Sequence, residues 1–192
     1  MASADRIRWN EKFHKEKNAW KKHSPFLDEI ASFLPKKGRA IDVAGGPGRN
    51  ALWLAKKGFD VTLVDISDEA LTIAKERAIT LNLTMTYAEV DLEEGSFPEG
   101  PWDLVLCHHY LPIPILPDFR RTLSPHGLLV ICHPTKKNIE RNAHPSARYL
   151  VDEGVMRTKL KEYKVTVYKE AWFDGVHEVR LLAQLKGEDE QQ

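Results

Sequence analysis

The chain has 192 residues, which is enough for one domain with a sizeable core and too few for two of ordinary size. Its 28 basic and 28 acidic residues cancel, so no net charge draws it to nucleic acid or to an anionic membrane. No apolar stretch reaches the roughly 18 residues of a membrane-spanning helix and no signal peptide is evident, so we expect a soluble, cytoplasmic protein.

Residues 1–37 are expected to form a helical cap or lid ahead of the main domain. The stretch RIRWNEKFHKEKNAWKKH, at 6–23, mixes aromatic and basic residues. It predicts either a solvated helix packed through Trp9, Phe13 and Trp20 or a lid over a ligand. Apolar residues at helical spacing then predict a second helix packed in the core. The members of this apolar stripe are Phe26, Leu27, Ile30, Phe33 and Leu34.

Short apolar runs then alternate with helical patterns, which is typical of an α/β domain with a largely parallel sheet. Crossover helices are expected after the first two runs. One closes at Gly58, and the other opens at Ser67 as its N-cap. The two cysteines, Cys107 and Cys132, lie in apolar runs and are expected in the core rather than in a disulfide. The five runs cover residues 39–45, 59–65, 85–91, 102–108 and 127–133.

The last third of the chain has a different pattern. Residues 146–163 have a helical period, whereas 164–172 and 177–186 read as strands. Between them, Asp174 and Gly175 suit a hairpin turn. We therefore predict a Rossmann-like fold, with a seven-stranded, mostly parallel sheet, helices on both faces and an antiparallel C-terminal hairpin strand.

The segment IDVAGGPGRNALWLA, residues 41–55, places three glycines between the first strand and the first helix. Glycine lets a ligand approach the backbone closely, and the start of a helix offers free amides. Gly46, Gly48 and Ala51 have the spacing of a dinucleotide-binding turn, and Asp65 ends the second strand where a ribose-binding acid belongs. A nicotinamide-dependent (NAD(P)) oxidoreductase is therefore one interpretation.

Two further carboxylates favour a cationic ligand over a pyrophosphate. Asp42 ends the first apolar run, where an ionised group is costly unless it is hydrogen-bonded or faces a cation. S-adenosylmethionine carries an ammonium and a sulfonium and no phosphate. Asp91 follows the third strand, where it can accept a hydrogen bond from an adenine amino group, and Asp65 can bind the ribose hydroxyls. Alternatively, Asp65 and Asp91 only cap the segments that follow them, and Asp42 only braces the glycine loop.

The runs DVAGGPGRNALWLAKKGFDVTLVDIS, EVDLEEGSFPEGPWDLVLCHHYL and LSPHGLLVI resemble the class I S-adenosylmethionine-dependent methyltransferases, over residues 38–135. Within that superfamily, GRN and GFDVT are most similar to the tellurite-resistance methyltransferases and related small-molecule enzymes. The resemblance implies a methyltransferase domain over 38–186, and the charged tail at 187–192 is expected to be disordered. Two residues depart from the family pattern. Ala44 replaces the first motif glycine, which costs little if its φ is negative, and His126 replaces a glycine before the fifth strand.

The resemblance also implies the cofactor contacts. The glycine loop wraps the methionine part of S-adenosylmethionine, Asp65 binds the ribose, and Asp91 with Leu92 holds the adenine. S-adenosylhomocysteine is then the product. Arg49 either contacts the methionine carboxylate or is a solvated helix start. The expected cofactor-binding residues are Asp42, Ala44, Gly45, Gly46, Gly48, Arg49, Asn50, Asp65, Ile66, Asp91, Leu92 and His108.

The acceptor is expected outside the carboxyl ends of the fourth and fifth strands, because open α/β sheets bind ligands there. The runs CHHYLPIPILP and CHPTKKN at those ends supply His108, His109 and His133 as candidate catalytic residues. Such a histidine acts as a base for a protonated nucleophile or, as imidazolium, holds an anionic acceptor. One of the adjacent pair can instead be a core residue. Neither HxxxH nor HExxH spacing occurs, so no metal is expected.

The predicted function is methyl transfer to a small-molecule acceptor, such as an oxyanion or a thiol. The chain lacks the (N/D)PP(Y/F) signature and the Pro-Cys nucleophile of base methyltransferases, which argues against a nucleic-acid acceptor. The lysine-rich N-terminal helix is the one feature that favours nucleic acid. The alternatives are the NAD(P)-dependent oxidoreductase and a non-catalytic S-adenosylmethionine-binding module. Monomer and homodimer are both compatible with the sequence.

Overall fold

The computed structural model describes residues 2–19 and 21–187, which form two compact units. The first unit ends at Trp102 and the second begins at Asp103. Trp20 and the tail beyond residue 187 lie outside the described residues, so the packing of Trp20 and the disorder of the tail stay predictions. None of the helices in the described ranges is long and apolar enough to cross a membrane.

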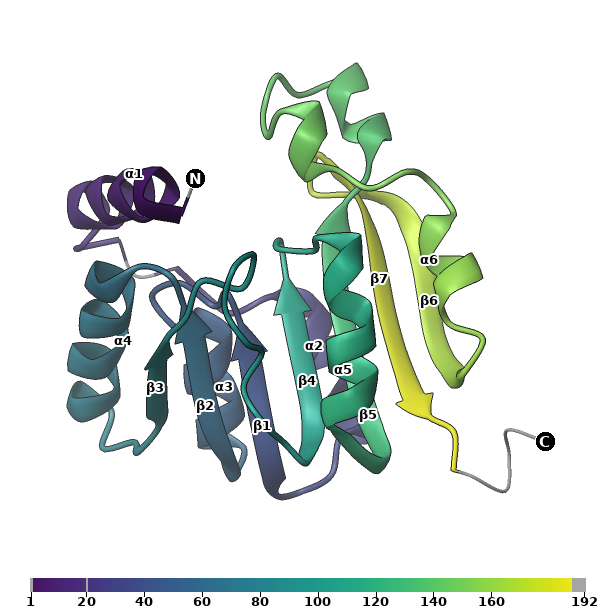
Figure 1. Ribbon diagram of the computed structural model, residues 1–192, viewed down its shortest axis with the longest axis horizontal. Helices are drawn as coiled ribbons and strands as arrows, with labels where there is room; N and C mark the ends of the chain where they lie inside the picture. The colour runs from purple at the N-terminus through teal and green to yellow at the C-terminus, as the bar shows by residue number, and fades with distance from the viewer. Residues whose placement is uncertain (1, 20, 188–192) are drawn as a thin grey trace. The chain divides into compact units, whose positions relative to one another are not determined.

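Three parallel strands form the sheet of the first unit, in the order β3-β2-β1 (Figure 1). β1 (Gly38–Val43) pairs with β2 (Phe59–Asp65), and β2 pairs with β3 (Thr86–Glu89). β1 and β2 are rich in buried apolar residues, as is usual for parallel strands covered on both faces. The three predicted strands are confirmed to within a few residues. Because parallel strands end at one edge, the segments after all three strands meet there.

Two helices follow β1 and β2 along the chain and pack on the strands. α3 (Arg49–Lys56) ends shortly before Gly58, whose φ of 99° is the left-handed conformation predicted for a helix end. α4 (Asp68–Thr80) begins after Ser67, whose hydroxyl accepts a hydrogen bond from the amide of Ala70 at 3.0 Å. The prediction of Ser67 as the N-cap is confirmed.

The predicted apolar stripe forms only in part. α2 (Pro25–Ile30) is a short helix, and η1 (Ala31–Phe33) continues it as a 3₁₀ turn. Phe33 is 53% exposed, so its predicted place in the core is wrong, and Leu34 is half-buried. The tighter 3₁₀ turn, about 120° per residue instead of about 100°, rotates Phe33 off the buried face. The buried residues of α2 are Phe26, Leu27 and Ile30.

The second unit begins with two further strands, as predicted. They are β4 (Trp102–His108) and β5 (Leu123–Pro134). Between them lie a 3₁₀ turn, η2 (Ile113–Ile115), and α5 (Leu116–Thr122). The central residues of β4 and β5 are almost completely buried, and Phe119 of α5 is fully buried. These side chains form the core of the unit.

An antiparallel hairpin completes the second unit, which has the strand order β4-β5-β7-β6. β6 (Tyr163–Phe173) pairs with β7 (Val176–Leu185), and β7 pairs with β5 (Figure 1). The two turn residues, Asp174 and Gly175, have φ values of 48° and 85°. A two-residue turn with both φ positive matches the twist of a hairpin, so the predicted turn is confirmed.

The prediction of one helix over residues 146–163 is wrong. The segment forms η4 (Ala147–Tyr149) and α6 (Val155–Lys159), with extended residues between them. There the Val151 amide donates to the Pro134 carbonyl at 3.3 Å, and Gly154 has a φ of 72°. The backbone contact with the end of β5 and the left-handed glycine both interrupt the helix. A further turn, η3 (Lys136–Glu140), follows β5 directly.

Arg77 on α4 joins the N-terminal segment to the glycine loop of the first unit. Its guanidinium donates to the carbonyl oxygens of Pro47 at 3.2 Å, Lys17 at 3.4 Å and Ala19 at 2.8 Å. The side chain is nearly buried. The loop and the chain before it are therefore held by one charged donor.

We expect Arg77→Met to lower the free energy of unfolding by about 2 kcal/mol, because three carbonyl oxygens lose a charged donor. Methionine keeps much of the apolar stem of arginine. Chemical denaturation is the measurement, and Arg121→Met is the control, since Arg121 is half exposed and pairs with Asp118 at the surface. Equal unfolding free energies for the two variants would contradict the role of Arg77.

Candidate functional site

The glycine loop, residues 44–48, turns the chain from β1 into α3. The Gly48 amide donates to the Gly45 carbonyl at 3.1 Å, and the Gly45 amide donates to the Val64 carbonyl at 3.2 Å. Gly46 and Gly48 have φ values of 56° and 76°, in the left-handed region that glycine enters without strain. The glycine spacing of the sequence is thus a requirement of this turn.

Ala44 lies in the left-handed region as well, with a φ of 50°. The condition under which alanine would cost little, a negative φ, is therefore not met. Alanine costs about 1 kcal/mol more than glycine in this conformation. His126 has a φ of 63°, which explains why a glycine suits that position in relatives. Both departures from the family pattern place a side chain on a backbone that glycine would adopt more easily.

Asp42 is fully buried at the end of β1, directly beneath Gly45. A Cβ atom on Gly45 would lie 2.6 Å from Asp42 Oδ2 and 2.5 Å from Leu63 Cδ1, so only glycine fits there. Neither carboxylate oxygen makes a hydrogen bond of ordinary geometry with a described residue. Burial raises the pKa of Asp42 to about 7, and the amide of Ala51 and the charge of Arg49 offset only part of this rise. The first unit thus holds a carboxyl group whose charge is not compensated.

Asp65, at the end of β2, braces the glycine loop. Its Oδ2 accepts a hydrogen bond from the Gly46 amide at 2.8 Å, and its Oδ1 accepts one from the Ser67 amide at 2.9 Å. Burial raises the pKa of Asp65, and these amide hydrogen bonds reduce the rise. The predicted ribose contact stays a prediction. Each oxygen keeps a second lone pair that a hydroxyl can use.

Asp91 offers one unused acceptor after β3. Its Oδ1 accepts a hydrogen bond from the Glu93 amide at 2.9 Å, whereas Oδ2 is buried and makes no hydrogen bond with a described residue. The Val90 amide donates to the Asp65 carbonyl at 3.0 Å, which brings this turn to the end of β2. The structure therefore brings the predicted acids of β1, β2 and β3 to one edge of the first unit. The adenine contacts of Asp91 and its half-buried neighbour Leu92 stay predictions, as does the contact of Ile66.

Arg49 and Asn50, at the start of α3, bind the chain that precedes α2. Arg49 Nη1 donates to the Lys22 carbonyl at 3.3 Å, and Asn50 Oδ1 accepts a hydrogen bond from the Ser24 amide at 2.9 Å. These contacts anchor the N-terminal segment. These hydrogen bonds do not test the predicted contact of Arg49 and Asn50 with the cofactor, which stays a prediction.

α1 (Ala2–Lys15) lies beside α4 in the first unit (Figure 1). The Phe13 ring would come within 3.2 Å of a Cβ atom on Gly46. Asn10 Oδ1 accepts a hydrogen bond from the Ser67 hydroxyl at 2.6 Å. Sequence reasoning missed Asn10, because nothing in its neighbourhood marks it apart from other polar residues of a solvated helix. The lid role of α1 stays a prediction.

The candidate histidines of the second unit fall into two groups. His108 and His109 lie side by side at the end of β4, with ring centroids 4.0 Å apart. His109 Nε2 donates to Glu178 Oε2 at 2.9 Å. Burial alone would raise the pKa of Glu178, but the hydrogen bonds from His109 and Arg180 outweigh it and lower that pKa. Glu178 is therefore ionised and favours a positive charge beside it.

His133, near the end of β5, is buried and neutral. Its Nε2 lies 2.9 Å from the Tyr149 carbonyl, which can only accept, so Nε2 carries the proton. Burial lowers the pKa of His133 to about 4, although the hydrogen bond to Tyr149 raises it somewhat. The Nδ1 atom is buried and makes no hydrogen bond with a described residue. At neutral pH this residue would not hold an anionic acceptor as imidazolium.

Comparison with known proteins identifies the domain. Residues 40–127 match the family model of a methyltransferase domain. The chain is 33% identical over 120 residues to a putative methyltransferase, YqeM of Bacillus subtilis, and the match covers 56% of this chain and 48% of that protein. It is 26% identical over 136 residues to the 23S rRNA (uracil(747)-C(5))-methyltransferase of Pyrococcus abyssi, covering 69% of this chain and 32% of that enzyme. The chain therefore spans half or less of these curated relatives.

Among solved structures, TehB from Haemophilus influenzae has a TM-score of 0.72 at 19% identity, covering 93% of this chain and 67% of that chain. Residues 40–127 are thus similar to a methyltransferase domain, and the fold is that of TehB. The likeness confirms the predicted Rossmann-like fold, with seven strands that are parallel apart from an antiparallel C-terminal pair. The resemblance to the class I methyltransferases, those of the TehB type included, is confirmed.

We expect Asp42→Asn to stabilise the ligand-free protein, by an amount that depends on pH. The folded pKa of about 7 exceeds the unfolded value of about 3.9, so Asp42 contributes stability below about pH 4 and loses it as the pH rises through 7. Asparagine has no such dependence. The advantage of the variant in thermal unfolding should therefore grow from about pH 4 to about pH 7 and stay constant above that.

Asp60→Asn is the control for Asp42→Asn, because Asp60 is exposed on the same three-stranded sheet. Its midpoint of thermal unfolding should stay close to that of the unmodified chain at every pH. An advantage of Asp42→Asn that does not change between pH 5 and pH 8 would contradict the raised pKa.

Proposed function

We propose that the chain is a methyltransferase that transfers a methyl group from S-adenosylmethionine to a small-molecule acceptor. The methyltransferase domain implies S-adenosylmethionine as the cofactor, as the sequence predicts. The observation that carries the proposal is the buried, unpaired carboxyl group of Asp42 beneath the glycine loop. A pyrophosphate would be repelled by this group, whereas a ligand with an ammonium and a sulfonium compensates it.

The residues around the loop have separate tasks in holding this ligand. Asp42 acts on the two positive charges across the Gly45 backbone, and in an apolar environment its field extends over several ångströms. The amides at the start of α3 suit the methionine carboxylate. Asp91 Oδ2 accepts a hydrogen bond from the adenine amino group, and Asp65 keeps the loop in shape and takes a ribose hydroxyl.

S-adenosylmethionine supplies a methyl group that a nucleophile displaces in line from the sulfonium, so positioning provides much of the acceleration. The acceptor side of the reaction is assigned to His108, the last residue of β4, and to His109, which follows it. The Nε2–H of His109 donates a hydrogen bond to Glu178, which orients the ring, and a histidine at this place can remove a proton from a thiol or bind an oxyanion.

A small-molecule acceptor is supported by the balanced charge of the chain and by the absence of base-methyltransferase motifs from its sequence. One relative acts on 23S rRNA by its name, so an RNA base is the competing acceptor class. The two classes differ in salt dependence, because binding of a polyanion weakens steeply as salt concentration rises.

The test is calorimetric titration of the full chain with S-adenosylmethionine, S-adenosylhomocysteine and NADH. We expect the two adenosyl ligands to bind and NADH not to bind. Asp42→Asn should weaken binding of S-adenosylmethionine by at least about tenfold, since the loss of an opposite charge costs about 1.4 kcal/mol or more. Asp91→Asn should weaken the binding of both adenosyl ligands to the same extent. Asp60→Asn, at an exposed position, should leave their binding unchanged.

Two outcomes would count against the proposal. If NADH binds and the adenosyl ligands do not, the glycine loop is a dinucleotide-binding site and the oxidoreductase interpretation is favoured. Binding of S-adenosylmethionine without transfer of labelled methyl to any member of a panel of thiols, oxyanions and RNA would favour the non-catalytic module.

A further inference from the structure

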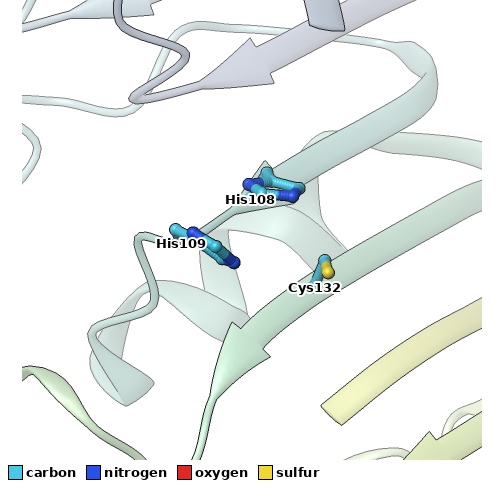
Figure 2. Close-up of side chains that lie close together, drawn as sticks. All are labelled: His108, His109 and Cys132. Carbon is cyan, nitrogen blue, oxygen red and sulfur yellow. The ribbon is translucent and has the colours of Figure 1, made fainter. Parts of the chain in front are cut away.

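Two histidines and a cysteine of the second unit lie close together at the ends of two strands. His108 is the last residue of β4, His109 follows it, and Cys132 is two residues from the end of β5. One ligand atom from each of the three lies within 4.8 Å of the others. Figure 2 shows the three side chains gathered between the two strand ends. The grouping brings together two imidazoles and a thiol that the sequence separates by more than 20 residues.

The grouping depends on an unusual backbone conformation at His109. Successive side chains of an extended strand point to opposite faces, so His108 and His109 would normally face apart. His109 instead has a φ of 61°, in the left-handed region, and the two rings lie 4.0 Å apart. The His109 amide donates to the Cys132 carbonyl at 2.8 Å, which fixes this turn against β5. Strain of this kind at a non-glycine residue concentrates at functional sites.

Glu178 prepares His109 to bind a cation. Its buried carboxylate lies 2.9 Å from His109 Nε2 and can only accept, so in the neutral imidazole Nδ1 carries the lone pair. A carboxylate that holds the second nitrogen of a histidine ligand is the usual outer contact of metal sites. Arg180 Nε donates to the other carboxylate oxygen at 2.7 Å and fixes Glu178 in place.

The donor set indicates the kind of cation. Two imidazoles and a thiolate suit a borderline-soft ion such as Zn²⁺, whereas Mg²⁺ and Ca²⁺ prefer oxygen ligands. In a tetrahedral zinc site the ligand atoms lie about 3.5 Å apart, so a bound cation would draw together three ligand atoms that lie within 4.8 Å of one another here. Cys132 is buried on its strand, and the exposed side of His109 gives the cation a path of entry.

We propose that His108, His109 and Cys132 bind a zinc-type divalent cation, with Glu178 as the outer contact of His109. Three protein ligands leave one coordination position open, as in catalytic rather than structural zinc sites. The sequence did not reveal this site, because it lacks the short spacings of metal-binding motifs. The cation would replace the thiol proton of Cys132, and its binding would therefore release a proton and weaken at acid pH.

The test uses the full chain, stripped with a chelator and titrated with Co²⁺ under anaerobic conditions. Co²⁺ adopts the tetrahedral geometry of zinc sites, and thiolate ligation adds a charge-transfer band in the near ultraviolet. We expect one equivalent of Co²⁺ to bind with this band and Zn²⁺ to displace it. Cys132→Ser should abolish the band, and His109→Asn should weaken Co²⁺ binding by at least about tenfold.

The control variants are Cys107→Ser and His144→Asn. Cys107 is the other buried cysteine, whose thiol donates to the Tyr110 carbonyl, and His144 is exposed on a loop. Both should leave the cobalt spectrum unchanged. His109→Asn keeps the test informative if Cys132→Ser fails to fold, because asparagine tolerates a left-handed backbone at a partly exposed position.

No cobalt band with Co²⁺ in the low micromolar range, or a band and stoichiometry that Cys132→Ser and His109→Asn leave intact, would overturn the proposal. Titration with S-adenosylmethionine separates this result from the proposed cofactor binding, since the contacts assigned there to S-adenosylmethionine belong to the first unit. Loss of cobalt binding with retained S-adenosylmethionine binding concerns the metal site alone.

Discussion

The charge of Asp42 is the physical constraint on which the first unit depends. The carboxyl group is fully buried, lies beneath Gly45, and makes no hydrogen bond of ordinary geometry with a described residue. A group of this kind is kept only where something else compensates it. In the ligand-free chain, a proton neutralises the charge of Asp42 over much of the pH range below its pKa of about 7. A cationic ligand above the loop provides the same compensation without a proton.

The remaining structure of the first unit holds the loop over this carboxyl group. Asp65 accepts one amide hydrogen bond from Gly46 in the loop and one from Ser67 after β2, and Arg77 donates to the carbonyl of Pro47. Ala44 is strained, and such strain persists only where the surroundings fix the backbone. The loop is therefore held in a rigid, preformed shape, which lowers the entropic cost of binding a ligand.

The sequence predicted the parts of the fold that depend on local chemistry. The strands, the N-cap at Ser67 and the hairpin turn at Asp174 follow from apolar runs, side-chain acceptors and residues that tolerate positive φ. Phe33 was predicted to be buried, but the helix tightens into a 3₁₀ turn there. Residues 146–163 were predicted to form one helix, but a contact with β5 interrupts it. Such contacts between distant segments leave no local signal in the sequence.

The residues of the candidate site also include some that local sequence predicts and some that depend on contacts between distant segments. The acids near the ends of β1 and β2 and after β3 could be predicted, since residue type and position at a strand end identify them. The roles of Asn10 and Arg77 could not, because both depend on where the N-terminal segment lies. The cluster of His108, His109 and Cys132 was also hidden. It depends on a left-handed backbone at His109, and a histidine in the sequence does not predict that conformation.

The measurement that tests the central claim most directly is the number of protons released when S-adenosylmethionine binds at pH 6. Calorimetric titrations in buffers of different ionisation enthalpy give this number. Asp42 is protonated in the free protein at this pH, so close to one proton should be released, and Asp42→Asn should release none. Binding without proton release, or equal release from the variant, would contradict the account of Asp42 as the group that a cationic ligand compensates.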